Sequence, residues 1–237
     1  MVRHSNSIRI ILVVMMLKKA ISIAVHLLTA SGVVIGLWAL LLIMQEDADN
    51  ALRLLALAAV IDAVDGTLAR KFDIKRHMPD IDGGLIDNLV DYLTWVFIPM
   101  VWAWSFLGIP FAVCAVVLLS SVIGFAHTRA KTPDHFFRGF PSYWNVVILY
   151  LFLLEADAVI SSIILILLAV LVLMPVKFVY PSRTPTLQKT TLLLALPYII
   201  MLGIMLLFFG DTPRWLVLLS LYYPVYYTGL SLYLSRR

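Results

Sequence analysis

The sequence has few charged residues and many hydrophobic ones. Of its 237 residues, 14% are charged and 62% are hydrophobic. Soluble domains carry about 25% charged and about 45–50% apolar residues, so this composition excludes an ordinary soluble domain. The chain is therefore expected to be an integral membrane protein, in which about 20 apolar residues form each transmembrane helix.

Cysteine is also nearly absent. The single cysteine, Cys114, lies within an apolar run, and one cysteine excludes an internal disulfide. No cluster of Cys and His residues of the kind that binds zinc is found in the sequence. The net charge of +4 comes from basic residues dispersed among the connections, which is not the concentrated patch typical of a nucleic-acid partner.

The apolar runs predict an all-α bundle of about eight transmembrane helices. Before them, residues 1–20 carry Arg3, Arg9, Lys18 and Lys19 around a short apolar stretch, which is typical of an amphipathic helix lying on the membrane surface. We therefore divide the chain into an interfacial segment, 1–20, and a transmembrane domain, 21–237. The expected spans are 22–44, 51–70, 83–104, 107–127, 141–154, 157–178, 189–209 and 213–234.

The distribution of basic residues predicts the orientation. With eight spans, all of the 18 lysines and arginines except Arg53 and Arg214 fall on one side of the membrane. Connections rich in Lys and Arg face the cytoplasm, so both termini are expected to be cytoplasmic. The connections of the opposite side are acidic and carry Glu46, Asp47, Asp49, Glu155, Asp157 and Asp211.

Four aspartates interrupt the apolar sequence near two helix ends. Asp62 and Asp65 are an i,i+3 pair, and Asp87 and Asp91 are an i,i+4 pair, so each pair projects from one face of its helix. A charged side chain at the centre of a spanning helix costs about 2.5–3.5 kcal/mol on insertion scales. Four such side chains, joined by the short charged loop 71–82, therefore indicate a functional site.

The residues around the aspartates indicate phosphoryl transfer. Neighbouring carboxylates repel one another unless they are protonated or bind a cation, and an all-oxygen site suits Mg²⁺ or Mn²⁺. Gly66 and Ala69 leave the backbone accessible beside the acids, and Arg70 supplies a positive charge for a phosphate. Gly83 begins the next helix, whose N-terminus favours anions. Together these residue types describe a metal-dependent phosphoryl-transfer site.

These residues also carry a family resemblance. The pattern Asp62-x-x-Asp65-Gly66-x-x-Ala69-Arg70, followed by Gly83-x-x-x-Asp87-x-x-x-Asp91, resembles the signature of the CDP-alcohol phosphotransferase family. The spacer of twelve residues between the two halves, 71–82, is longer than in most of the family. That spacer and the segments 136–145 and 175–184 resemble the branch of the family that synthesises phosphatidylcholine.

The resemblance implies a reaction in which choline and CDP-diacylglycerol give phosphatidylcholine and CMP. It implies that Asp62, Asp65 and Asp87 bind the metal, and that Asp91 shares the metal and removes the proton from the choline hydroxyl. It also implies a bacterial inner membrane location and suggests a homodimer, and the positive-inside rule places the active site on the cytoplasmic side.

The resemblance further implies that Gly66 and Ala69 line the cytidine pocket and that Arg70 binds phosphate or holds the site together. Lys177 and Arg183 fall on the same side of the membrane and are candidates for binding phosphate. Alternatively, Lys177 and Arg183 contribute only to the excess of basic residues on the cytoplasmic side and bind no ligand.

Choline imposes a requirement of its own. A quaternary ammonium group cannot donate a hydrogen bond and is bound by aromatic faces. Tyr143, Trp144 and Tyr92, near the expected cytoplasmic helix ends, are the candidates for this contact. An aromatic belt at the membrane interface would explain the same residues without choline.

Two other functions remain open from the sequence. The same fold could use serine, glycerol phosphate or inositol phosphate as the acceptor. A transporter could use intramembrane carboxylates to carry cations or protons. The transporter is disfavoured, because the carboxylates cluster at cytoplasmic helix ends rather than the midplane and no internal repeat is evident.

Overall fold

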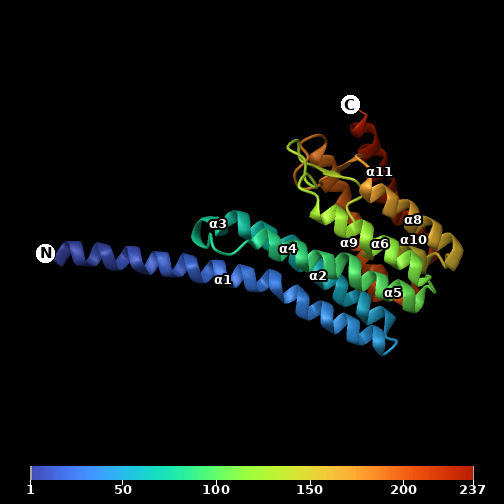
Figure 1. Ribbon diagram of the computed structural model, residues 1–237, viewed down its shortest axis with the longest axis horizontal. Coiled ribbons are helices and arrows are strands. Elements are labelled where there is room, and N and C mark those ends of the chain that lie inside the picture. Colours follow the sequence, from blue (N-terminus) through green and yellow to red (C-terminus); the bar gives the residue numbers. More distant parts are fainter. Residues whose placement is uncertain (1, 237) are drawn as a thin grey trace.

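The computed structural model describes the backbone of residues 2–236 and the side chains of residues 12–236, and it is mostly helical (Figure 1). In chain order the helices are α1 (Val2–Met44), α2 (Ala48–Lys71), α3 (Ile74–His77), α4 (Gly83–Asp91), the π-helix η1 (Tyr92–Phe97), α5 (Ile98–Phe106), α6 (Phe111–Ala126), α7 (Trp144–Leu153), α8 (Ala158–Leu173), α9 (Gln188–Leu207), the 3₁₀-helix η2 (Phe209–Asp211), α10 (Arg214–Ser220) and α11 (Tyr222–Ser235).

Three helical stretches of the described residues are long and apolar enough to cross a membrane: Leu12–Met44, Gly83–Phe106 and Gln188–Leu207. The helices α6, α7 and α8 are apolar but shorter. The prediction of a mostly helical membrane protein is confirmed at this level. The number of eight spans and the cytoplasmic location of the termini stay predictions.

The first helix differs from the prediction. Between Val2 and Met44 it runs without interruption, so a separate interfacial helix ending near residue 20 is not seen in this stretch. In Figure 1 the N-terminal part of α1 extends past the rest of the chain. No glycine or proline occurs around residue 20 to end a helix there. The side chains of Arg3 and Arg9 lie outside the described residues, and the division into two domains at residue 20 stays a prediction.

Two short strands, which the sequence did not predict, accompany the helices. β1 (Phe136–Arg138) pairs antiparallel with β2 (Lys177–Val179), with Phe137 opposite Phe178. Strand β2 also packs on α11, because the backbone N–H of Val179 donates to the Ser231 hydroxyl at 3.0 Å. The connections after α6 and after α8 are therefore held together at one end of the bundle.

The last predicted span is divided. Residues 213–234 form two helices, α10 and α11, rather than one. Pro224 lies in the first turn of α11 and has no backbone N–H to donate to the preceding turn, so one continuous helix would lose a hydrogen bond there.

Close packing of α1 on α4 and α5 requires small residues. A Cβ atom at Gly32 would overlap the Val90 side chain, and one at Gly36 would lie 2.8 Å from Cδ1 of Ile98. These two glycines bring α1 against the helix that carries Asp87 and Asp91.

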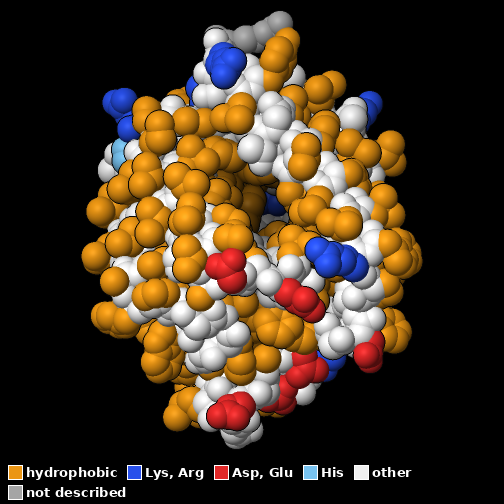
Figure 2. All heavy atoms as spheres, turned by 90° about the vertical axis from the view of Figure 1, so that its right-hand side faces the viewer, with side chains coloured by type: hydrophobic (Ala, Val, Ile, Leu, Met, Phe, Trp, Pro, Cys, Tyr) orange, Lys and Arg blue, Asp and Glu red, His pale blue; other side chains and the backbone are white. Residues whose placement is uncertain are grey.

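The two ends of the bundle differ in charge. The acidic connections α1–α2, α7–α8 and α9–α10 belong to the face shown in Figure 2, where acidic side chains are scattered over a largely hydrophobic surface. The Arg53 guanidinium links the start of α2 to the end of α9, because it pairs with Asp49 at 2.9 Å and donates to the Leu206 carbonyl at 2.9 Å. The segment joining α2 to α4 lies at the other end of these helices; it carries Lys75 and Arg76 and follows Arg70 and Lys71 at the end of α2.

Candidate active site

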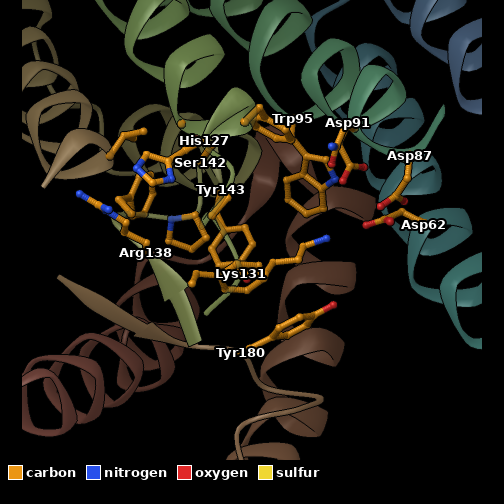
Figure 3. Close-up of a pocket in the computed structure, with 18 of the residues that line it drawn as sticks. Asp62, Asp87, Asp91, Trp95, His127, Lys131, Arg138, Ser142, Tyr143 and Tyr180 are labelled. Atoms are coloured by element: carbon orange, nitrogen blue, oxygen red, sulfur yellow. The ribbon is translucent and has the colours of Figure 1, made fainter. Parts of the chain in front are cut away.

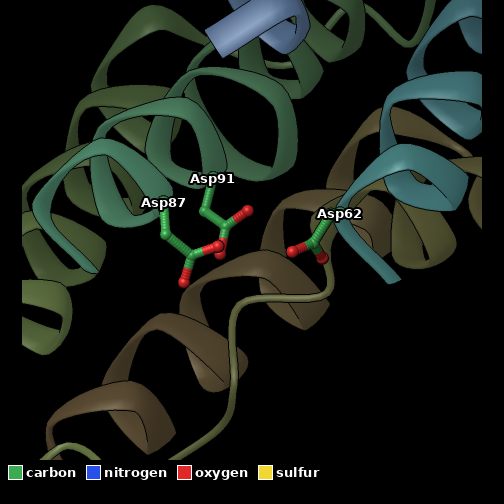
Figure 4. A group of neighbouring side chains, drawn as sticks. All are labelled: Asp62, Asp87 and Asp91. Atoms are coloured by element: carbon green, nitrogen blue, oxygen red, sulfur yellow. The ribbon is translucent and has the colours of Figure 1, made fainter. Parts of the chain in front are cut away.

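Three of the predicted carboxylates lie together. Asp62 projects from α2, and Asp87 and Asp91 project from α4, and Figure 4 shows the three side chains pointing toward one another. One oxygen of each carboxylate lies within 4.8 Å of the others, and all three residues are half-buried. The i,i+4 spacing of Asp87 and Asp91 places both on the face of α4 that meets Asp62.

Asp65 lies outside this group. It is only 3% exposed, and its carboxylate lies beside the side chain of Thr29 on α1. It projects one turn after Asp62 toward α1 rather than toward Asp91. The structure therefore brings together three of the four carboxylates that were expected as metal ligands.

The three-carboxylate group fits a divalent cation. Among residues 12–236, no lysine or arginine forms an ion pair with Asp62, Asp87 or Asp91. Three half-buried carboxylates without an ion-pair partner repel one another, and a cation relieves that repulsion. Carboxylate oxygens are hard ligands, so the group suits a hard cation.

A first cavity of about 410 Å³ borders all three carboxylates (Figure 3). Its remaining walls come from η1, from the loop after α6 and from the residues after β2. Basic and imidazole groups, Lys131, Arg138 and His127, line part of it. The rest is largely aromatic, with Trp95, Phe137, Phe140, Tyr143 and Tyr180 in the wall.

A second cavity, of about 890 Å³, lies on the other side of the carboxylates. It collects the residues that the sequence predicted for nucleotide and phosphate binding: Gly66, Ala69, Arg70, Gly83 and Arg183. Asp62, Asp87, Lys131 and Tyr180 line both cavities. The two cavities therefore meet at Asp62 and Asp87. Asp91 lines the first cavity but not the second.

The N-terminus of α4 is not free to bind an anion in the way that was predicted for Gly83. The Asp82 carboxylate accepts hydrogen bonds from the backbone N–H groups of Gly84 at 3.0 Å and Leu85 at 3.1 Å. An aspartate is a strong N-cap, and it already satisfies these two N–H groups. Gly83 is required for space instead, because a Cβ there would lie 2.8 Å from Cε1 of His26.

Two candidate choline contacts are placed away from the cavities. Trp144 is fully buried and its indole N–H donates to the Ser121 hydroxyl at 3.0 Å, so the prediction that it contacts choline is wrong. The Tyr92 hydroxyl donates to the Leu118 carbonyl at 3.2 Å and its ring packs edge-on against Phe125. Tyr143, the third candidate, lines the first cavity.

Lys177, a candidate for phosphate binding, also lies outside both cavities. Its ammonium forms an exposed ion pair with Asp134 at 2.7 Å. Hydrogen bonds from Lys177 and from the Thr132 hydroxyl hold the pKa of Asp134 below its usual value. The Lys177 side chain therefore links strand β2 to the loop that precedes β1.

Comparison with known proteins decides the family. A family model described as CDP-alcohol phosphatidyltransferase matches residues 21–176, which include all four aspartates and most residues of the first cavity. The chain belongs to this family. It is therefore a membrane phosphatidyltransferase, and the predicted family is confirmed.

Curated relatives of this CDP-alcohol phosphatidyltransferase extend the match over most of the chain. A protein of Legionella pneumophila is 39% identical over 220 residues, 88% of this chain and 86% of that protein. One of Pseudomonas aeruginosa is 34% identical over 228 residues, 93% of this chain and 94% of that protein. One of Legionella bozemanae is 45% identical over 170 residues, 70% of this chain and 78% of that protein. All three are named phosphatidylcholine synthase.

The structure of this phosphatidyltransferase adds two site residues that the sequence did not single out. Lys131 attracts the Asp62, Asp87 and Asp91 carboxylates electrostatically, and Figure 3 shows its ammonium directed toward them. Nothing in the sequence distinguished it from the other basic residues of its loop. The Trp95 side chain lies beside the Asp62 carboxylate. Its position four residues after Asp91 was the available signal, since i,i+4 residues share a helix face.

Proposed function

We propose that this chain is a phosphatidylcholine synthase, which transfers the phosphatidyl group from CDP-diacylglycerol to choline and releases CMP. The observation that carries the proposal is the meeting of two cavities at Asp62 and Asp87, one lined by the family signature and one lined by aromatic residues and Asp91. Two substrates that exchange a phosphatidyl group need adjoining sites of this kind. The shared name of the relatives supports choline as the acceptor.

In this proposal Asp62, Asp87 and Asp91 hold a Mg²⁺ or Mn²⁺ ion, with Asp65 beside them as the fourth acidic residue of the site. A bound divalent cation supplies charge neutralisation for the diphosphate and for the charge that develops on the departing phosphate. The mutual approach of the three carboxylates within 4.8 Å supports this assignment.

The second cavity receives the CDP part of the donor lipid. Gly66 and Ala69 line the cytidine side, and Arg70 and Arg183 bind the phosphates. A Cβ at Gly66 would make an ordinary van der Waals contact, at 3.4 Å, with a terminal nitrogen of Arg70. The absence of a side chain at Gly66 leaves the backbone accessible to a flat base.

The first cavity receives the acceptor alcohol, with Asp91 as its general base. The choline oxygen forms a bond to the phosphorus that carries diacylglycerol, and its proton passes to Asp91. The bond between that phosphorus and the oxygen of CMP breaks, and CMP leaves with that bonding electron pair. Asp91 lines the first cavity and not the second, which supports its role as the base for the acceptor alcohol.

The site is proposed to face the cytoplasm of a bacterial cell, with both termini on that side of the inner membrane. The basic loop beside the carboxylates and the acidic connections at the other end of the bundle support this orientation. A homodimer is proposed from the family resemblance.

One observation favours a second acceptor class. Lys131 and Arg138 both line the first cavity, and two basic side chains suit a phosphorylated alcohol such as glycerol phosphate or inositol phosphate. The experiment is to incubate the purified protein with CDP-diacylglycerol, Mn²⁺ and each radiolabelled alcohol, including serine, and to identify the lipid formed. We expect label only from choline. Label from a phosphorylated alcohol or from serine, with none from choline, would refute choline as the acceptor.

A further inference from the structure

Two aromatic rings of the first cavity are arranged as a corner. The ring centroids of Trp95 and Tyr143 lie 5.7 Å apart, and their planes are inclined by 57°. Rings inclined at this angle overlap less than stacked rings do. Because both residues line the cavity and are half-buried, the corner is a wall of that cavity.

Both rings are packed against neighbouring groups. The Trp95 side chain lies beside the Asp62 carboxylate. The Tyr143 ring packs against the Tyr227 ring with centroids 6.1 Å apart, and the Tyr227 hydroxyl donates to the Val179 carbonyl at 2.9 Å. The corner is therefore fixed before a ligand arrives, which reduces the entropy lost on binding.

Other aromatic residues in the same cavity are already engaged. Tyr180 stacks on Phe137 with centroids 4.4 Å apart, and the Arg183 guanidinium lies 5.4 Å from the Tyr180 centroid. Phe140 packs edge-on against the buried ring of Trp144 at 5.2 Å. Tyr143 also packs on Phe140 and Tyr227, with centroids 6.3 and 6.1 Å apart, whereas Trp95 has a ring contact with Tyr143 alone among the described residues. Trp95 and Tyr143 are the contacting ring pair of this cavity that includes the helix carrying Asp91.

The corner also lies next to the proposed general base. Trp95 follows Asp91 by four residues where α4 continues into η1, and its partner Asp62 belongs to the same carboxylate group. Only two carbons separate the nitrogen and the oxygen of choline. A site for its ammonium group must therefore border the base that receives the hydroxyl proton.

We propose that Trp95 and Tyr143 bind the trimethylammonium group of the acceptor and select a quaternary ammonium over a primary amine. This inference rests on the proposed function. A trimethylammonium group has no N–H to donate, so aromatic faces attract it while hydrogen-bond acceptors gain nothing from it. Figure 3 shows the Lys131 ammonium directed toward the three carboxylates and Arg138 at the opposite end of the cavity.

The test measures the KM values for choline and for CDP-diacylglycerol in detergent-solubilised full-length protein with Mn²⁺. Trp95→Leu and Tyr143→Leu are each expected to raise the KM for choline about tenfold, the loss of one cation–π contact, while the KM for CDP-diacylglycerol stays unchanged. The matched control is Trp104→Leu, in the same span but 59% exposed and outside both cavities. It is expected to change neither KM.

The conservative variants separate two effects at Trp95. Trp95→Phe keeps a ring but removes the indole N–H, so it is expected to lower kcat through loss of the contact with Asp62 while the KM for choline rises less than in Trp95→Leu. Tyr143→Phe keeps its ring and is expected to retain the KM for choline within about threefold.

A direct probe does not depend on any variant. Tetramethylammonium chloride is expected to inhibit the unmodified protein competitively against choline and to inhibit Trp95→Leu and Tyr143→Leu more weakly. Unchanged choline KM values in both leucine variants, or no competition by tetramethylammonium, would overturn this inference alone. Failure of the unmodified protein to make phosphatidylcholine from choline would instead overturn the proposed function.

Discussion

The carboxylates of Asp62 and Asp91 lie within 4.8 Å of each other, although a basic loop and a short helix separate their two helices in the sequence. This approach joins the second cavity, which Asp62 lines, to the proposed general base, which lines only the first. Asp62 and Asp91 are both expected to bind the metal, but only Asp91 is expected to act as the general base.

The first prediction concerns Asp91. Asp91→Asn keeps the size and polarity of the side chain but removes the group that accepts the proton. We expect the rate of phosphatidylcholine formation to fall at least about 100-fold, a typical loss for a general base, while CDP-diacylglycerol still binds. Initial rates with labelled choline and binding of CDP-diacylglycerol to the purified protein measure the two quantities.

The matched control for Asp91 is Asp134→Asn. Asp134 lies on the same side of the bundle but is exposed and pairs with Lys177 outside both cavities. An exposed ion pair contributes about 0–1 kcal/mol, so this variant should keep the rate within about twofold. A normal rate in Asp91→Asn would remove Asp91 from the role of base.

The second prediction concerns the metal. Excess EDTA should abolish phosphatidylcholine formation, because the diphosphate and three carboxylates then repel one another, and Mn²⁺ or Mg²⁺ should restore it. Asp62→Asn and Asp87→Asn should raise the Mn²⁺ concentration that gives half of the maximal rate. Full activity in excess EDTA would exclude a metal at this site.

The third prediction concerns Lys131, which lines both cavities where they meet. A cation at that position stabilises the charge that develops on the departing phosphate. Removal of one such group typically lowers kcat by about 100- to 1000-fold. We expect a loss of this order in Lys131→Met and partial recovery in Lys131→Arg.

Arg129→Met is the control for Lys131. Arg129 belongs to the same loop and lines neither cavity, so its loss should leave kcat nearly unchanged. Equal losses in Lys131→Met and Arg129→Met would show that the loop needs positive charge in general rather than an ammonium group at residue 131.

Local spacing made part of the site predictable. Asp87 and Asp91 were expected on one face of a helix from their i,i+4 spacing, and their meeting with Asp62 follows once α2 and α4 both pack on α1. Asp65 is separated from these three residues and lies beside Thr29 of α1, a contact between distant segments that no local pattern contains.

The burial of Trp144 and the pairing of the two strands depend on tertiary packing, which the local sequence does not specify. The sequence around Tyr143 and Trp144 does not say which ring enters the core, and the buried Trp144 faces Ser121 on α6 instead of the cavity. The two strands form only because loops 40 residues apart are brought together. The capping of α4 by Asp82, by contrast, was readable from the sequence, since aspartate before a helix is a common N-cap.

The fourth prediction tests how α1 supports the site. Gly32 is buried against Val90, the residue that precedes Asp91, and a Cβ at Gly32 would overlap the Val90 side chain. Gly32→Val must therefore push α1 away from α4. Overpacking typically costs about 1–3 kcal/mol, and the displacement also moves Asp91 relative to Asp62.

We expect Gly32→Val to lower both the thermal midpoint of the detergent-solubilised protein and its rate of phosphatidylcholine formation. Gly203→Val is the matched control, because Gly203 lies in another long apolar helix, α9, and no atom lies within 4 Å of a Cβ placed there. If both variants lowered the midpoint equally, the cause would be the β-branched side chain rather than the contact with Val90. A lower midpoint in Gly32→Val alone, together with a lower rate, would show that the packing of α1 on α4 sets the distance between the Asp62 and Asp91 carboxylates.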